Sequence, residues 1–538
     1  HSGLMSRAAE AVPAPAPALL WIGFSAMCLG MFMAILDIQI VITSLPVIQD
    51  ALHIGADRMS WVQTAYLIAE VIAIPLTGLL TRVFTLRWLF TGAIATFTLA
   101  SIGCASSMGF ADLIVWRIMQ GLAGGVLIPL VFSAIFLLFA RGFQQTAATT
   151  MGGVLAVLAP ALGPISGGML TENFSWHWLF LINVIPGIIT LAAGAACLPR
   201  EKRQLNLLRS LDWLSLLFIA MALGSLEIGL KEAPDRGWSS GPVLGLFSII
   251  AICAWLAVKR PKPTVDFALL HDRKLAFGCG VSFILGAGLF GSVYLMPVFL
   301  AFVRGHGPIA IGVIILVTGI AQLITAPIAV MLDRRFDARL LSAIGFACFA
   351  VGLAMSAGQT IATDYDEMFW PQVVRGSFVA LCILPPTRFA LGFLPLERVS
   401  DASGLYNLSR NLGGAIGIAL IDTVMFTQAP IHAGRLTELI HSNPPEAAKL
   451  LGLGVDDLPA TDDAFGLISI MDAIQDASLT MAINQAWAML ALITAFSLVL
   501  LWLMGPIRGS FPAANATPGR MTAPRQPTDE RVNALLTK

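Results

Sequence analysis

Four ionisable side chains lie inside long apolar stretches of the sequence: Asp37, Glu70, Arg117 and Asp422. A charge in the middle of a membrane span costs at least about 2.5–3.5 kcal/mol, so such a residue indicates a functional site by default. A carboxyl group in this setting can exchange a proton, because desolvation favours the neutral acid and a nearby guanidinium favours the carboxylate. Arginine does not release its proton. We therefore predict that Asp37, Glu70 and Asp422 carry protons and that Arg117 is the charge partner.

Depth along the apolar stretches groups three of these residues. Counting about 1.5 Å per helical residue from the span ends, Asp37, Arg117 and Asp422 lie roughly 10 Å deep and Glu70 roughly 15 Å deep. Side chains of opposite charge at one depth are expected to converge on one cavity. The sequence leaves alternatives open, namely a static ion pair of Asp37 with Arg117 and a water-exposed lining or span-end position for Glu70 or Asp422.

Further polar side chains on the same stretches are candidates for lining a cavity, or for hydrogen bonds between helices. These candidates are Gln39, Gln63, Gln120, Asn183, Gln322 and Asn407. Arg375 is expected to lie deep enough to neutralise an anionic ligand. Arg388 and Arg410 are placed near span ends, where a long side chain can reach the lipid phosphates. No metal-ligand spacing is present, so no metal site is expected.

The elements that hold these residues are predicted to be membrane-spanning helices. Hydrophobic residues make up 57% of the 538-residue sequence and charged residues 12%, a balance that water-soluble domains do not have. About 20 apolar residues cross a bilayer as a helix. The predicted fold is therefore an all-α membrane protein with 14 transmembrane helices. The predicted spans are 21–44, 60–80, 88–106, 111–138, 147–171, 178–198, 212–230, 241–258, 275–300, 310–331, 339–357, 368–391, 402–427 and 484–504.

Loop charge predicts how the chain is oriented. The short loops on one side hold 16 Lys or Arg residues, and those on the other side hold only Arg58, Lys231, Arg236 and Arg304. The positive-inside rule places the first side, and both termini, in the cytoplasm. His1–Leu4, which precede Met5, are interpreted as a remnant of an added tag. Residues 1–20 and 505–538 are polar or rich in Ala and Pro, and are predicted to be disordered tails.

A duplication is visible in the loop sequences. Residues 75–89 (PLTGLLTRVFTLRWL) align without a gap on 327–341 (PIAVMLDRRFDARLL), with six of fifteen positions identical. We interpret 21–198 and 275–504 as two six-helix halves and 212–258 as an inserted helix pair. Transporters built from repeats bind substrate near the membrane midplane between the halves. The alternative is that any span end followed by arginines looks alike.

One predicted loop is much longer than the others. Residues 428–480, on the outer side, are strongly acidic, and the pieces 431–442 and 464–478 have amphipathic helical spacing. This segment is either a solvated loop or a docking surface for a partner outside the membrane.

Several enzyme classes are excluded by missing motifs. The sequence contains no Gly-Lys dipeptide, and hence no P-loop, and it has no H-E-x-x-H motif. We expect no enzyme activity, no cofactor and no nucleic-acid partner, so any pumping must draw on an ion gradient.

Four sequence motifs carry a resemblance to a known family. They are LDIQIVITSLP (36–46) with Asp37, RIMQGLAGG (117–125) with Arg117 and Gln120, ALGPISGG (161–168) with Gly163, Pro164, Gly167 and Gly168, and GLLTRVFTLR (78–87) with Gly78, Arg82 and Arg87. Together they resemble the major facilitator superfamily and, within it, the 14-span drug:proton antiporters of the EmrB/QacA type. The second repeat carries the corresponding residues Asp333, Arg334 and Arg339. The sequence departs from the family at Thr81, where an acid is usual, so Asp333 is the expected counterpart of that acid.

The resemblance implies a function. It implies proton-coupled export of amphipathic, largely hydrophobic compounds by alternating access of two halves, in the inner membrane of a Gram-negative bacterium. It also implies a periplasmic adaptor protein and an outer-membrane channel as partners. The alternatives are export of a specific metabolite, lipid or siderophore, import of a small molecule by proton symport, and a membrane scaffold or receptor that does not transport.

Overall fold

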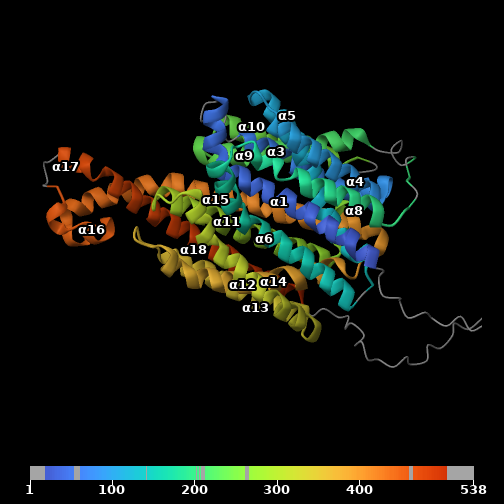
Figure 1. Cartoon of the computed structure of the whole chain (residues 1–538). Helices are drawn as coiled ribbons and strands as arrows, with labels where there is room; N and C mark the ends of the chain where they lie inside the picture. The colour runs from blue at the N-terminus through green and yellow to red at the C-terminus, as the bar shows by residue number, and fades with distance from the viewer. Residues whose placement is uncertain are drawn as a thin grey trace, which may run out of the picture. The chain divides into compact units, whose positions relative to one another are not determined.

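Long α-helices make up the computed structural model, which describes residues 18–53, 61–140, 142–201, 203–204, 206, 212–260, 266–459 and 464–505 (Figure 1). No β-strand occurs among the described residues, so the predicted all-α class is confirmed. The predicted tails fall largely outside this range, although α1 already begins at Ala18. The longer elements are α1 (Ala18–Leu52), α3 (Trp61–Ala73), α4 (Thr77–Ala105), α5 (Phe110–Leu138), α6 (Phe143–Asn173), α8 (Val184–Cys197), α9 (Trp213–Arg236), α10 (Gly241–Val258), α11 (Arg273–Phe302), α12 (Pro308–Arg335), α13 (Ala338–Met355), α14 (Tyr365–Leu391), α15 (Leu396–Ser442) and α18 (Met471–Met504). The shorter ones are η1 (Ile74–Leu76), α7 (Trp178–Leu181), η3 (Phe267–His271), η4 (Ser356–Gly358), α16 (Pro444–Leu451), η5 (Val455–Asp457) and α17 (Ala464–Ser469).

The helices include many that are able to span a membrane. Within the described residues, 12 helical runs are long and apolar enough to cross, and 13 if the bent α6 counts as one span. The bend in α6 is 48° and falls between Pro160 and Ile165. The run Trp61–Ala105 enters this count once, although it is 45 residues long. The chain is therefore a multi-pass membrane protein, and the predicted number of fourteen spans is not confirmed by the count.

Aspartates in the loops determine where several helices begin. Asp212, Asp272, Asp337 and Asp364 are the N-cap residues of α9, α11, α13 and α14, and each accepts a hydrogen bond from a backbone N–H of the first turn. An N-cap side chain satisfies a backbone donor that has no partner within the helix. These four residues therefore set the starting points of the helices α9, α11, α13 and α14.

The helices pack in the same pairs in both predicted halves. In the first half α1 packs on α6 and α8, α3 on α5, and α4 on α5 and α8. In the second half α11 packs on α15 and α18, α12 on α14, and α13 on α14 and α18. The halves meet where α6 contacts α12 and where α15 contacts α4 and α5. The inserted helix α9 packs on both α3 and α15, so it contacts both halves, while α10 packs on α9.

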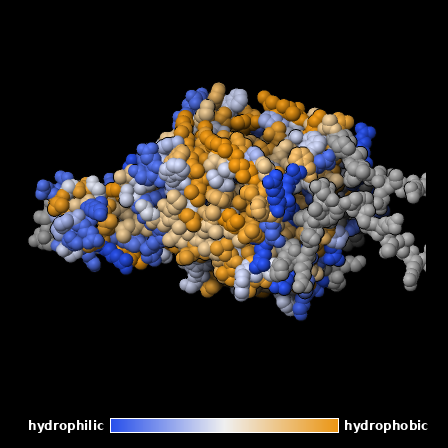
Figure 2. All heavy atoms as spheres, turned by 90° about the horizontal axis from the view of Figure 1, so that it is seen from below, coloured by the Kyte–Doolittle hydropathy of each residue, from blue (hydrophilic) through white to orange (hydrophobic). Residues whose placement is uncertain are grey.

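The faces of the helix bundle are apolar. On α8, Ile185, Ile188 and Ile189 are all exposed, at spacings that place them on one side of the helix. Figure 2 shows hydrophobic residues covering most of the bundle surface in that view. Contiguous apolar surface of this extent is stable in lipid rather than in water.

The predicted long loop is mostly helical. The α15 helix continues to Ser442, and α18 begins at Met471, so both run beyond the other helices and carry α16 and α17 (Figure 1). We call the described residues of 428–480 the α15–α18 extension. The extension has a small apolar core of its own, formed by Leu436, Ile440, Ala447, Leu451, Ile470, Ile474 and Ala477. The expected helical piece 431–442 is confirmed as part of α15, whereas 464–478 is divided at Ile470 into α17 and the first turns of α18.

Candidate functional site

The structure joins Asp37 on α1 to Arg117 on α5. Arg117 Nη1 donates to Asp37 Oδ2 at 2.5 Å, and both side chains are fully buried. Asp37 Oδ1 accepts two more hydrogen bonds, from Gln120 Nε2 at 2.9 Å and from Asn183 Nδ2 at 2.8 Å. A buried ion pair is stable only when its remaining hydrogen-bonding capacity is also satisfied, and here Asp37 has three donors.

The guanidinium of Arg117 is held on every side. Its Nε donates to the carbonyl oxygen of Val62 at 3.1 Å, and Nη2 donates to Gln63 Oε1 at 3.1 Å. The ring of Tyr66 lies 4.5 Å from its Cζ atom, which adds a cation–π contact. Gln63 and Gln120, expected as cavity residues, are therefore part of this closed network. The geometry is that of the static ion pair that the sequence also allowed, and proton exchange at Asp37 stays a prediction.

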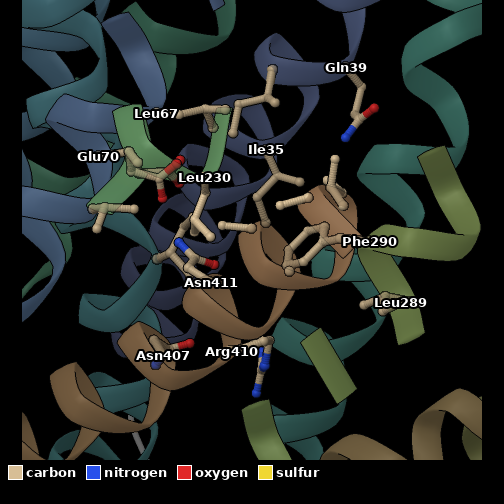
Figure 3. Close-up of a pocket in the computed structure, with 18 of the residues that line it drawn as sticks. Ile35, Gln39, Leu67, Glu70, Leu230, Leu289, Phe290, Asn407, Arg410 and Asn411 are labelled. Carbon is tan, nitrogen blue, oxygen red and sulfur yellow. The ribbon is translucent and has the colours of Figure 1, made fainter. Parts of the chain in front are cut away.

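A cavity of about 290 Å³ lies beside this network, between the two halves. Helices α1, α3, α5 and α6 of the first half, α11, α14 and α15 of the second, and the inserted α9 all contribute to its wall. Apolar side chains such as Ile35, Leu67, Leu230 and Phe290 form most of the surface (Figure 3). The polar and charged residues of the wall are Gln39, Thr64, Glu70, Glu227, Lys231, Asn407, Arg410, Asn411 and Asp422. Apolar walls with a few polar groups are typical of small-molecule sites.

Two glutamates lie on neighbouring parts of this wall. Glu70 on α3 is 3% exposed, and its carboxylate points into the cavity in Figure 3. Glu227 on α9 is 8% exposed and lines the same cavity. Gly224, one turn before Glu227, packs against Ile68 and Ile72, which flank Glu70 on α3. Neither carboxylate has a hydrogen bond or an ion pair among the described residues.

Asp422 and Lys231 also reach the cavity, but each has a partner within the protein. Asp422 on α15 accepts a hydrogen bond from Tyr294 Oη at 2.7 Å. Lys231 Nζ lies 4.2 Å from the ring centroid of Trp61. The placement of Lys231 in an outer loop was wrong, because α9 continues to Arg236. Asp422 shares the cavity with Glu70, whereas Asp37 and Arg117 are not among its lining residues.

The other predicted polar residues fall into two groups. Gln39 and Asn407 line the cavity. Gln322 borders a separate void of about 10 Å³ next to Thr150, and its amide atoms have no partner in the described part of the chain. Arg375 is buried in the second half, where its Cζ lies 4.7 Å from the ring centroid of Trp487.

The sequence assignments of Arg388 and Arg410 to lipid phosphates were wrong. Arg388 Nη1 forms an ion pair with Asp333 Oδ2 at 3.1 Å, within the second half. Arg410 lies on the cavity wall, 7% exposed. The depth of Arg410 was counted from the predicted end of its span. Because α15 extends without a break from Leu396 to Ser442, that predicted end does not determine how deep Arg410 lies.

The cavity is closed at one end by contacts between the halves, which we call the Arg82 end. Arg82 on α4 forms an ion pair with Asp401 on α15, and a Cβ atom at Gly78 would overlap Asp401. Ser403 Oγ donates to the carbonyl oxygen of Pro129 at 3.0 Å. Asn407, one turn further along α15, already lines the cavity. The acid of this closure is thus Asp401. Asp333, which was expected to supply it, pairs with Arg388 instead.

The remaining loop-motif arginines bind at helix ends. Arg87 donates to the carbonyl oxygens of Ala195 and Leu198 at the end of α8. Arg339 donates to those of Leu501 and Trp502 near the end of α18. Arg334 lies over the ring of Phe143, at 4.4 Å.

The glycine-rich motif of α6 permits close packing. A Cβ atom at Gly163 would overlap the side chain of Gln39 on α1, so only glycine allows this approach of the two helices. Gly167 and Gly168 are buried. The motif therefore places Gln39 against the cavity wall; the side chain of Pro164 lies outside the described residues.

Sequence reasoning missed Glu227 and Asn411 as cavity residues. Glu227 lies in a predicted span, and its charge was a usable signal. The inserted helix pair was interpreted as an addition outside the two halves, so Glu227 was not predicted to line the cavity. Nothing in the sequence distinguishes Asn411 from other polar residues on α15, since the rotation of a helix about its axis decides which side chains face a cavity.

Two helical halves with a closed end and an apolar cavity between them define the class of secondary transporters. Comparisons with known proteins agree. Residues 27–418 match the profile of the Major Facilitator Superfamily. The chain belongs to this superfamily.

Relatives cover almost the whole chain. The chain is 36% identical to "Colistin resistance protein EmrB" of Acinetobacter baumannii over 490 residues, which is 88% of this chain and 95% of the relative. It is 30% identical to "Multidrug export protein EmrB" of Escherichia coli strain K12, over 90% of this chain and 95% of the relative. Among solved structures, the human organic anion transporter MFSD10 (TETRAN) superposes with a TM-score of 0.58 at 12% identity, covering 90% of this chain and 100% of the other. This last similarity shows the fold alone.

Proposed function

We propose that the chain is a proton-coupled multidrug efflux antiporter that exports amphipathic compounds across the inner membrane by alternating access. The observation that carries this proposal is the cavity between the halves, whose apolar wall contains the unpaired carboxyl groups of Glu70 and Glu227. A carboxyl group in such a wall can take up a proton when the substrate leaves and release it when the substrate binds. The names of the relatives support export of several compounds rather than of one.

The roles of the buried acids follow from their surroundings. Glu70 is the primary proton carrier, because it reaches the cavity and has no ion-pair partner among the described residues. Asp422 adds a second acid on the opposite half. Asp37 couples to them indirectly, since α1 carries both Asp37 and the cavity residues Ile35 and Gln39. The proton gradient is the proposed energy source, and no cofactor is required.

We further propose fourteen spans with both termini in the cytoplasm. The run Trp61–Ala105 has 45 residues, which at 1.5 Å per residue is about 67 Å of helix, more than twice the roughly 30 Å of a hydrocarbon core. It is interrupted at Thr85, where φ is 69° and ψ is 160°. Counting this run as two spans and the bent α6 as one gives fourteen. Loop charge then places the Arg82 end in the cytoplasm, so the closure is on the cytoplasmic side.

The test uses inside-out vesicles from a strain that lacks its own pumps. When respiration acidifies the interior, an exporter is expected to accumulate a fluorescent amphipathic cation while the interior becomes more alkaline. Glu70→Gln should abolish both signals at unchanged membrane content of the protein. Glu232→Gln is the matched control, because Glu232 pairs with Arg236 and is not among the residues lining the cavity. Full activity of Glu70→Gln would contradict the proposed coupling. If protons and dye leave the vesicle interior together, the protein is a symporter.

The α15–α18 extension is the proposed docking surface for a periplasmic adaptor, which would connect the pump to an outer-membrane channel. The extension has its own apolar core and surrounds it with acidic residues, among them Glu438, Glu446 and Asp456. Deleting 436–476 should abolish resistance in intact cells but preserve dye transport in inside-out vesicles. Loss of both would favour the scaffold alternative.

A further inference from the structure

The cavity wall carries charge of both signs. Glu70 on α3 and Glu227 on the inserted helix α9 contribute two carboxylates, and Arg410 on α15 contributes a guanidinium. In Figure 3, Leu230 and Asn411 lie between Glu70 and Arg410. We call the part of the wall around Glu70 and Glu227, where Lys231 also lies, the acidic end, and the part around Arg410 the basic end.

Among the described residues, no cation forms an ion pair with Glu70 or Glu227 at the acidic end. Glu70 and Glu227 both line this end, and the buried Arg117 is already paired with Asp37. Two carboxylates facing one low-dielectric space repel each other, so the pair favours a proton or a bound cation between them. Lys231, the other charged cavity residue on α9, contacts the ring of Trp61 and forms no ion pair with Glu227.

The basic end lacks an anion. The Nε and Nη2 atoms of Arg410 have no hydrogen-bond partner in the described part of the chain, and no carboxylate lies within ion-pair distance there. Instead, the Cζ atom of Arg410 lies 5.5 Å from the ring centroid of Phe132 and 5.3 Å from that of Tyr406. A buried cation without a counter-ion is strongly disfavoured, and planar guanidinium groups bind carboxylates through two parallel hydrogen bonds. Asn411, on the same face of α15, can donate a further hydrogen bond to an anionic group.

We propose that the cavity is a site for zwitterionic amphiphiles, with the cationic group of the substrate between Glu70 and Glu227 and its anionic group at Arg410. This inference rests on the proposed efflux function and names the substrate class and the residues that select it. The apolar wall between the two ends takes the hydrophobic body of the ligand. The inserted helix is then part of the binding site, because Glu227 belongs to it and to neither half.

The test measures binding of three dyes of similar size to the purified full-length protein in lipid nanodiscs. Rhodamine 19 is zwitterionic, rhodamine 6G is its ethyl ester and is cationic, and fluorescein is anionic. Fluorescence polarisation should give a Kd for rhodamine 19 at least about tenfold lower than for either of the others, the discrimination expected when one buried charged contact is lost. Equal Kd values for rhodamine 19 and rhodamine 6G would overturn the proposal.

Variants then assign the two ends. Glu227→Gln should weaken binding of both rhodamines about tenfold, whereas Glu232→Gln, on the same helix but outside the cavity, should change neither. Arg410→Gln should bring the ratio of the two rhodamine Kd values towards one, and Arg410→Lys should keep most of the preference, which separates loss of charge from loss of folding. Arg435→Gln is the control on α15, since Arg435 is exposed. An unchanged ratio in Arg410→Gln would refute the basic end.

Transport distinguishes the two proposals. If rhodamine 6G drives proton exchange in inside-out vesicles but rhodamine 19 is neither preferred nor exported, the substrate class is wrong while the efflux function stands. If no dye drives proton exchange, the efflux function itself fails.

Discussion

Arg87 and Arg339, at matching positions of the sequence repeat, make the same contact in the two halves. Each donates to carbonyl oxygens at the C-terminal end of the last helix of its own half: Arg87 to α8, and Arg339 to Leu501 at 2.7 Å and Trp502 at 3.0 Å on α18. The last carbonyl groups of a helix lack intrahelical donors and form the negative end of its dipole. The repeat therefore preserves a helix-end contact, which a chance similarity of basic span ends does not explain.

We predict that Arg87→Ala and Arg339→Ala lower the free energy of unfolding by similar amounts, about 1 kcal/mol each. Lysine at either position should recover part of the loss, because it keeps the charge but makes fewer hydrogen bonds. The measurement is the thermal midpoint of the purified protein in one detergent. Arg334→Ala is the control, since Arg334 is exposed and contacts only the ring of Phe143 among the interactions described. A loss as large in Arg334→Ala as in Arg339→Ala would contradict the helix-end interpretation.

Depth in the membrane could be predicted from the sequence, and rotation about the helix axis could not. Counting residues placed Asp37 and Arg117 at one level, and the structure joins them. The same count placed Asp422 at that level, but Asp422 points to Tyr294 and the cavity instead. Helices that are apolar on all sides give no periodic signal for which face is buried. The sequence therefore cannot show whether side chains at the same depth face one another; the packing of the helices decides this.

Interactions between distant segments were the other limit. The acid that pairs with Arg82 was expected near Arg82 in the sequence, at Thr81 or its repeat partner Asp333. The structure supplies it from Asp401, more than 300 residues away, because α15 crosses α4 at Gly78. Spacing within a motif cannot reveal such a partner.

The Arg82–Asp401 ion pair is predicted to hold the Arg82 end closed, which lies on the cytoplasmic side in the proposed topology. Asp401→Asn should increase the rate at which an impermeant maleimide labels Ala402→Cys from the cytoplasmic side, in a background without the seven native cysteines. Because Arg82 is partly exposed, the pair is worth at most about 1 kcal/mol, or roughly a fivefold change in the open population. The difference should shrink in high salt, which screens exposed charges. Slower labelling in Asp401→Asn would show that the contact does not favour closure.

Asp364 provides a pH-dependent contact at the opposite end of the bundle. It accepts hydrogen bonds from Arg304 Nη2 and His306 Nε2, each at 3.0 Å, and caps α14. Burial alone would raise the pKa of Asp364, but the hydrogen bonds from Arg304 and His306 outweigh it and hold the pKa below its ordinary value. The stability from this contact is therefore complete above the unfolded-state pKa of about 4 and is lost as the pH falls through the lower folded-state value.

We predict that Asp364→Asn lowers the thermal midpoint at pH 7 and that the gap to the unaltered protein closes as the pH is lowered below about 4. The measurement is a series of melting curves from pH 7 to pH 3. Asp366→Asn, in the same first turn but exposed, is the matched control and should show a smaller gap at pH 7. A gap that widens towards acid pH would reverse the sign of the linkage and exclude this account.

The second half contains an arginine that matches Arg117 by helix order but lacks an acid. Arg375 on α14 meets Met296 on α11, with 2.9 Å between Nη2 and Sδ, whereas Arg117 on α5 meets Asp37 on α1. The Nε and Nη1 atoms of Arg375 have no partner among the described residues. Removing one member of a buried ion pair costs roughly 3–5 kcal/mol, because the other charge is left uncompensated. Arg375 is such an uncompensated buried charge in the unaltered protein.

Met296→Glu should therefore stabilise the protein, by about 1–3 kcal/mol, since glutamate has nearly the length of methionine and supplies the missing charge. Met296→Gln, which offers a hydrogen-bond acceptor without charge, should recover less. Thermal midpoints of the two variants and of Asp37→Met, which recreates the unpaired arginine in the first half, are the measurements. The order expected from high to low is Met296→Glu, Met296→Gln, unaltered protein and Asp37→Met. A lower midpoint for Met296→Glu than for Met296→Gln would mean that Arg375 is already compensated and that the desolvation of a second charge outweighs the attraction.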